Sequence, residues 1–124
     1  MKELKFRAWD GKKIIDDVIP ASETSIIELY DRYEWGETEV KAVEQYTGLR
    51  DKNGKEIFIG DIVSEHNGDI IGEIIQKPSG EYCIGWIGIY AGSSILYDKL
   101  SMCEVVGNIH ENVNLLGEDR NEKA

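Results

Sequence analysis

Residues 45–63 read QYTGLRDKNGKEIFIGDIV, and this stretch decides the fold class of the chain. Its pair Asn53-Gly54 tolerates the positive φ angles of a tight turn between two extended segments. Gly60 then allows the backbone to bend before the apolar pair at 62–63. The stretch therefore predicts a β-hairpin followed closely by another strand.

The sequence after Val63 continues this rhythm of short apolar runs separated by turn residues, at 67–68, 78–80 and 92–94. The run 81–90 is rich in Ile, Tyr and Trp but is interrupted by Gly85 and Gly88, which is typical of a bulge or a sharp bend in a barrel strand. Residues 112–116 are expected to form a closing helical turn. Recurring short strands predict a small barrel or sandwich, with an SH3-like barrel in the central and C-terminal part.

The N-terminal side also shows strand patterning. Residues 4–9 alternate apolar and polar side chains and end at the turn pair Asp10-Gly11, so they predict a strand. Residues 14–15 and 18–19 predict a second short extended segment, which Pro20 closes because proline cannot donate to a sheet ladder.

Residues 21–39 allow two interpretations. Residues 22–25 could cap a short helix that runs through Ile26, Ile27, Leu29 and Tyr30. The alternative is another strand that leads into a mobile acidic loop around residues 35–37. In either case the chain is expected to be mainly β, with at most one or two short helices.

The length of 124 residues predicts one domain over residues 1–117, and residues 118–124 are expected to be a disordered tail. The chain has no apolar window long enough to span a bilayer, and its first residues lack the apolar core of a signal peptide, so we expect a cytoplasmic protein. Cys83 and Cys103 lie in apolar surroundings and are expected to be buried free thiols, with a disulfide as the alternative.

The formal charge of −10 opposes binding to a phosphate backbone, which basic proteins achieve through counterion release. The charge is unevenly distributed, since the charged residues among the first thirteen are mostly basic and those of residues 16–39 are mostly acidic. This pattern predicts either a dipolar surface or, more simply, solvated strand faces beside an acidic loop.

The quoted stretch resembles the YopX family of phage and prophage proteins, whose members read much like QYTGLKDKNGKEIYEGDIV. Two further blocks agree with that family: KFRAWD at 5–10, and EVVGNIHEN at 104–112 followed by Leu115-Leu116. The resemblance implies a strand-rich fold and a phage or prophage origin, and it carries over no biochemical activity and no catalytic residue. The Gly60-Asp61-Ile62-Val63 segment is also similar to strand starts in SH3-like barrels, which is an analogy of fold alone.

Catalytic and metal-binding patterns are weak in this sequence. His66 and His110 stand outside any local catalytic signature, and they are too far from each other and from the cysteines for the paired spacing of a zinc site. Asp51-Lys52-Asn53-Gly54 lacks the later glycine and the glutamate of a calcium loop. The glycines at 85, 88 and 92 do not match a nucleotide-binding loop. We therefore expect neither a cofactor nor a metal, and we do not expect an enzyme.

The leading hypothesis is a non-enzymatic binding or oligomeric assembly module, with exposed aromatic side chains at its interface and strand edges able to pair between copies. A host or phage protein would be the partner, or a second copy of the chain. A nucleic-acid-binding small barrel is the alternative, disfavoured by the net charge, and an acidic DNA mimic is a third hypothesis. The binding residues proposed from the sequence are Trp9, Trp35, Tyr33, Arg7, Arg50 and Lys52.

Overall fold

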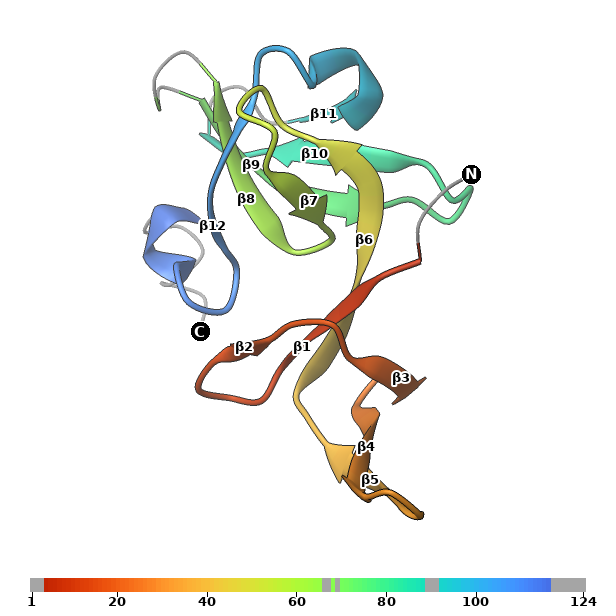
Figure 1. Cartoon of the computed structure of the whole chain (residues 1–124). Helices are drawn as coiled ribbons and strands as arrows, with labels where there is room; N and C mark the ends of the chain where they lie inside the picture. Colours follow the sequence, from red (N-terminus) through yellow and green to blue (C-terminus); the bar gives the residue numbers. More distant parts are fainter. Residues whose placement is uncertain (1–3, 66–67, 69, 89–91, 117–124) are drawn as a thin grey trace. The chain divides into compact units, whose positions relative to one another are not determined.

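The structure is a computed structural model that describes residues 4–65, 68, 70–88 and 92–116 (Figure 1). Contacts group the chain into two units, residues 1–46 and residues 47–124, and each unit is described by itself. The single domain expected over residues 1–117 stays a prediction, and the tail expected at 118–124 lies outside the described residues. In the described part of the chain, no helix has the length and apolar character needed to cross a bilayer.

The first unit contains β1 (Phe6–Trp9), β2 (Ile14–Ile15) and the beginning of β6 (Ala42–Arg50). β1 pairs antiparallel with both β2 and β6, so the strand predicted at 4–9 is confirmed. The turn after β1 depends on Asp10, whose Oδ1 accepts the backbone N–H groups of Lys13 and Lys12 at 2.9 and 2.7 Å. These two bonds stabilise the carboxylate and lower the pKa of Asp10.

The same unit contains a three-stranded antiparallel sheet in the order β3 (Ile19–Ser22), β4 (Ser25–Asp31), β5 (Glu34–Glu39). The helix considered for residues 26–30 is wrong, because these residues form β4. Ser22 turns the chain into the hairpin instead of capping a helix, since its Oγ accepts the N–H of Thr24 at 3.2 Å. In a helix this short, few backbone hydrogen bonds offset the free energy of nucleation, whereas β4 forms backbone pairs with a strand on each side.

Two other expectations for this region are corrected. Residues 35–37 are not a loop but lie in β5, paired with residues 27–29 of β4. Pro20 does not close the extended segment but lies inside β3, opposite Ile26. β3 is an edge strand, and the missing N–H of a proline is tolerated there.

The core of the first unit is small. Ala8, Ile26 and Val40 are buried, and Ile15, Val18 and Val43 pack against them. Arg7 and Glu44, which are directly opposed in β1 and β6, form a buried ion pair with Nε and Oε1 2.9 Å apart. Each of the two charges is compensated by the other, which is the condition for burying either one.

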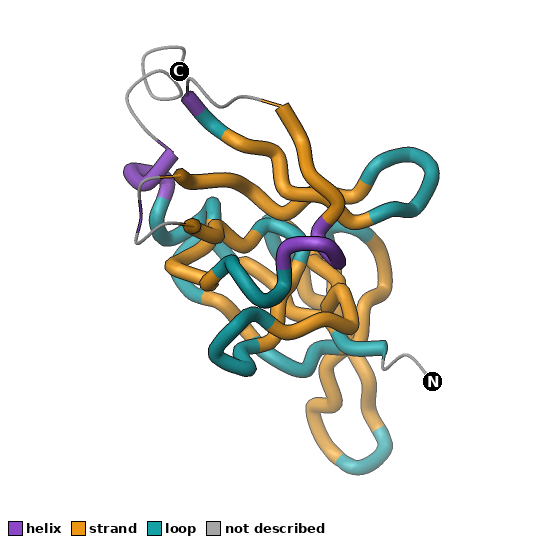
Figure 2. The backbone as a smooth tube through the Cα atoms, turned by 90° about the horizontal axis from the view of Figure 1, so that it is seen from above, coloured by secondary structure: helices purple, strands orange, loops and turns teal. Residues whose placement is uncertain are grey.

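The second unit contains the end of β6 and the strands β7 (Glu56–Phe58), β8 (Asp61–Glu65), β9 (Ile70–Gln76), β10 (Tyr82–Trp86), β11 (Gly92–Ile95) and β12 (Glu104–Asn108). Five of these strands form an antiparallel sheet in the order β11-β10-β9-β8-β12. The sheet curls as in a small β-barrel, and strands dominate the backbone (Figure 2). The described helices are two 3-10 turns, η3 (Leu96–Lys99) and η4 (Val113–Leu116). The mainly β fold and the closing turn near 112–116 are therefore confirmed.

The core of this unit gathers side chains from β7 to β10, β12 and the segment between β11 and β12. Its fully buried members are Ile57, Val63, Ile74, Ile84, Leu96 and Cys103, with Val105 at the margin. Each large aliphatic side chain buried in this way contributes about 1.5–3 kcal/mol of transfer free energy. The register of β10 is continuous through Gly85, and a shift lies instead between Val105 and Gly107 in β12.

Both cysteines lie in the second unit as buried free thiols, as expected from their apolar surroundings. Burial, with the nearby charges of Asp51 and Glu65, raises the pKa of the Cys103 thiol to about 11. The thiol is therefore protonated at neutral pH, which is unfavourable for a nucleophile.

Candidate functional site

The turn at residues 51–55 is held by one buried carboxylate. Asp51 Oδ1 accepts the backbone N–H groups of Asn53 and Lys55 at 2.8 and 2.9 Å. Its Oδ2 accepts the N–H of Val105 in β12 at 2.8 Å, and this bond is buried. Both oxygens of Asp51 thus fix the turn and tie it to a distant strand, so the turn interpretation of this motif holds.

The rest of the stretch that carries the family resemblance has similar structural roles. Thr47 Oγ1 donates to the carbonyl of Ile57 at 2.7 Å, and Asp61 Oδ2 accepts the N–H of Phe58 at 2.8 Å. Gly60 has a φ of 92°, which a side chain would strain. The polar groups of this stretch therefore hold the fold of the second unit, and the surface features that suggest binding lie in the first unit.

The candidate site is one face of the β3-β4-β5 sheet, which we call the outer face. The pairing of Ile19 with Ile27 and of Leu29 with Trp35 places these side chains on the same face, because side chains alternate along a strand. Ile26, which precedes Ile27 in β4, points to the opposite face and into the core. The outer face consists of Ile19, Ser25, Ile27, Leu29, Trp35, Glu37 and Glu39, of which Ser25 is buried.

Apolar side chains on the outer face are exposed. Ile19, Leu29 and Trp35 are 55%, 51% and 61% exposed, and Tyr33 in the turn at the hairpin tip is 83% exposed. Single exposed apolar residues are ordinary, whereas neighbouring ones surrounded by polar groups are typical of interaction surfaces. The aromatic side chains Trp35 and Tyr33 are also the types that dominate binding energy at protein interfaces.

On the opposite face of the hairpin, side-chain contacts connect β4 and β5 near the tip. The ring of Tyr30 lies over Gly36, where a Cβ atom would come within 1.9 Å of the ring. Thr38 Oγ1 donates to Glu28 at 2.7 Å and lies 3.3 Å from the Tyr30 hydroxyl. The absence of a side chain at residue 36 therefore lets the tyrosine ring cover the strand pair.

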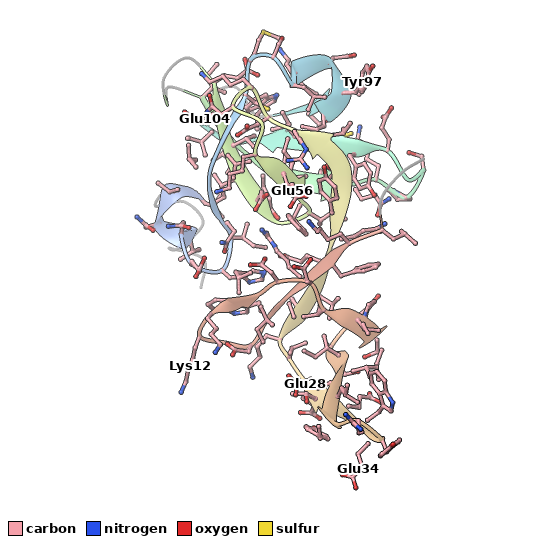
Figure 3. All side chains as sticks on the ribbon, viewed as in Figure 1. Lys12, Glu28, Glu34, Glu56, Tyr97 and Glu104 are labelled. Carbon is pink, nitrogen blue, oxygen red and sulfur yellow. The ribbon has the colours of Figure 1, made fainter. Side chains whose placement is uncertain are left out.

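Carboxylates surround the apolar part of the outer face. Glu37 accepts a hydrogen bond from Ser25 Oγ at 2.7 Å, while Glu34 and Glu39 are exposed at the two ends of β5. Figure 3 shows Glu34 at the hairpin tip and Glu28 further along the same hairpin. The outer face therefore combines an exposed tryptophan with the carboxylates of Glu37 and Glu39.

The structure brings together two of the binding residues proposed from the sequence, Trp35 and Tyr33. Trp9 is half-buried in β1, and Arg7 is buried in its ion pair with Glu44. Arg50 and Lys52 are exposed in the second unit, where Arg50 donates to the Gly54 carbonyl at 3.0 Å. Tyr90 and His66, also considered from the sequence, lie outside the described residues.

Sequence reasoning missed Ile19 and Leu29 as surface residues. The alternation at residues 25, 27 and 29 could have revealed them, but that pattern becomes a face only after β4 is assigned as a strand. A helix over the same residues would have placed Leu29 and Ile26 together in a buried stripe. The choice between helix and strand therefore decided whether this site could be predicted.

A hollow in the first unit is lined by Leu4, Lys5, Phe6, Asp17 and Val18, with a volume of about 220 Å³. Ordinary small-molecule sites are larger, about 300–1,000 Å³. Across residues 4–65, 68, 70–88 and 92–116, no three His, Cys, Asp or Glu side chains are grouped closely enough to hold a metal ion. Among these features of the described residues, the outer face is the candidate binding surface.

These observations describe a small, mainly β protein that presents an exposed hairpin face. The chain belongs to the YopX family, because the profile described as "YopX protein" matches residues 5–117, nearly the whole chain. A similar solved structure, described as "Crystal structure of protein EF1440 from Enterococcus faecalis", has a TM-score of 0.64 and 26% identity. The similarity covers 94% of this chain and all of that one. No curated protein matches the chain.

Proposed function

We propose that this protein is a non-enzymatic binding or assembly module that holds another protein chain against the outer face of its β3-β4-β5 sheet. The observation that carries the proposal is the exposure of Leu29 and Trp35, which are opposed across β4 and β5. Burying them in an interface would remove apolar surface from water, and the hairpin that presents them is already ordered, so little further entropy is lost on binding.

The non-enzymatic part of the proposal draws on the state of the candidate chemical groups. The thiol of Cys103 is buried and its pKa is raised to about 11. Asp51 and Asp61 accept backbone N–H groups through their carboxylates. These contacts are structural.

Two other functions are supported less well. Of the cations considered for nucleic-acid binding, Arg7 is buried with Glu44, and Arg50 and Lys52 belong to a different unit from Lys12 and Lys13. For a DNA mimic, the carboxylates of the hairpin are divided between its two faces, with Glu28 on one and Glu37 on the other. This division weakens the resemblance of the hairpin to the charged surface of a phosphate backbone.

The test is a selection from a random peptide library, displayed on a carrier, with the full chain as bait. A parallel selection uses the double variant Leu29→Ser and Trp35→Ser, and a third uses Ile95→Ser, which removes an exposed apolar side chain from β11. We expect peptides that bind the wild type and Ile95→Ser but not the double variant. Light scattering over a range of concentrations tests assembly in the same samples.

The proposal is supported by peptides that depend on residues 29 and 35, or by self-association that the double variant abolishes. It is overturned if the wild type selects no such peptide and stays a monomer at the highest concentration. Binding of single-stranded or duplex oligonucleotides at low salt would replace it with the nucleic-acid hypothesis.

A further inference from the structure

The two edges of the β3-β4-β5 sheet differ in how well they are protected from further pairing. β3 is short and contains Pro20, and its register shifts between Pro20 and Ser22. These features block strand addition. β5 has six residues without a proline, and in the described part of the chain the sheet ends at this strand. The β5 edge therefore offers unpaired backbone groups to an incoming strand.

The side chains of β5 specify what such a strand should carry. Trp35, Glu37 and Glu39 lie on the outer face, while Glu34, Gly36 and Thr38 lie on the other face. A strand added beside β5 places its alternate side chains next to these residues. An apolar side chain matches the exposed Trp35, and lysine or arginine matches the glutamates.

A second copy of the chain is a poor occupant of this edge. Pairing β5 with β5 brings residues 34, 37 and 39 of both copies, all glutamates, into one small sheet. Like charges on neighbouring strands are destabilising, and charged edge strands are a common protection against self-pairing. The formal net charge of −10 adds a general repulsion between copies.

From these observations we infer that β5 binds an extended cationic peptide segment of another protein by strand addition, with an apolar side chain against Trp35 and basic side chains against Glu37 and Glu39. This inference rests on the proposed function and specifies its partner. Backbone hydrogen bonds supply affinity in this mode, and the alternate side chains supply specificity. The acidic residues thus have two effects, because they repel another β5 and attract a basic strand.

The probe is a peptide with blocked ends and the sequence Lys-Thr-Lys-Thr-Ile-Lys, written to pair antiparallel with β5 from Glu39 to Glu34. Its isoleucine falls opposite Trp35, and its lysines fall opposite the three glutamates. A glutamate version of the peptide tests the charge. A version N-methylated at its third and fifth residues tests the backbone pairing, because it removes two N–H groups that face β5. Val40 donates its backbone N–H to the Thr24 carbonyl, so residues 36 and 38 direct their backbone groups to β4, and residues 35 and 37, opposite the methylated positions, direct theirs to the free edge.

Binding is followed by two-dimensional NMR of the isotope-labelled full chain during titration to about 1 mM peptide, the weak end of specific binding. We expect shifts at amides of residues 34–39 and slower hydrogen exchange at the edge-facing amides of residues 35, 37 and 39, with a smaller response in the second unit. The glutamate and N-methylated peptides should bind at least about tenfold more weakly.

Variants of the protein complete the test. Trp35→Ser and Glu37→Lys should each weaken binding by about tenfold or more, as expected for a central aromatic contact and a charge reversal. Glu81→Lys repeats the charge reversal and Ile95→Ser replaces another exposed apolar side chain by serine, both in the second unit, and these controls should bind as the wild type does.

The inference is overturned if the lysine peptide leaves the β5 amides unchanged, or if the glutamate peptide binds equally well. It is also overturned if the β5 amides are protected in a dimer of the chain without peptide. The proposed function remains supported after these results if the library selection yields peptides that depend on Trp35 but bind in another conformation. The proposed function itself fails if the selection yields no peptide that depends on Trp35.

Discussion

The turn at residues 51–55 and the β4-β5 hairpin are both rich in carboxylates, but the carboxylates have different roles. Asp51 is buried and accepts three backbone N–H groups, so its charge stabilises the fold of the second unit. Glu34 and Glu39 are exposed, and the hairpin also contains an exposed tryptophan, Trp35. The comparison teaches that abundance of acidic residues says little about function until burial and hydrogen bonding are known.

The largest expected effect is that of removing the buried carboxylate. Asp51→Ala should lower the free energy of unfolding by about 3 kcal/mol, because it leaves the buried N–H of Val105 and two turn N–H groups without their acceptor. Urea unfolding followed by circular dichroism measures this. Asp51→Asn keeps one acceptor oxygen and should lose less. Equal stability of all three proteins would contradict the assigned role.

A second effect contrasts two glycines. A Cβ atom at Gly72 would come within 2.4 Å of Ile84 and 3.0 Å of a backbone carbonyl, so Gly72→Ala should cost about 2 kcal/mol. At Gly36 the obstructing group is the exposed ring of Tyr30, which can rotate away, so Gly36→Ala should change stability by less than about 1 kcal/mol. The same unfolding measurement compares the two, and a reversed order would refute the packing argument.

A third effect concerns pH. Because the pKa of Cys103 rises from 9.0 to about 11 on folding, the unfolded chain loses this proton first as pH increases. The contribution of the protonated Cys103 thiol to the free energy of unfolding is therefore complete below pH 9 and is lost as pH rises towards 11. Unfolding experiments on the wild type and Cys103→Ala should show a difference that shrinks over this range. A difference that grows with pH would contradict the assigned cause.

The smallest effect is expected on the outer face of the hairpin. Trp35→Ser and Glu39→Gln should each change the free energy of unfolding by less than about 0.5 kcal/mol, since both side chains are exposed. Chemical denaturation under the conditions used for Asp51→Ala tests this directly. A loss comparable to that of Asp51→Ala would mean that these residues support the fold instead of a partner.

Much of the fold could be predicted from local patterns. The alternation at residues 4–9 and the Asn53-Gly54 turn specify strands and reversals through side chains and backbone angles that depend on neighbours in sequence. The secondary structure of residues 26–30 could not be predicted, because the same apolar residues fit a short helix and a strand equally well. Pairing with β3 and β5 decided between them.

By itself, the sequence determined that this protein is mainly β, acidic and a member of the YopX family, because composition, periodicity and turn chemistry are local properties of the chain. Tertiary structure alone decided that Arg7 is buried against Glu44 while Trp35 is exposed beside Leu29. Burial depends on which strands pair and on which side chains then share a face, and contacts between distant residues settle both.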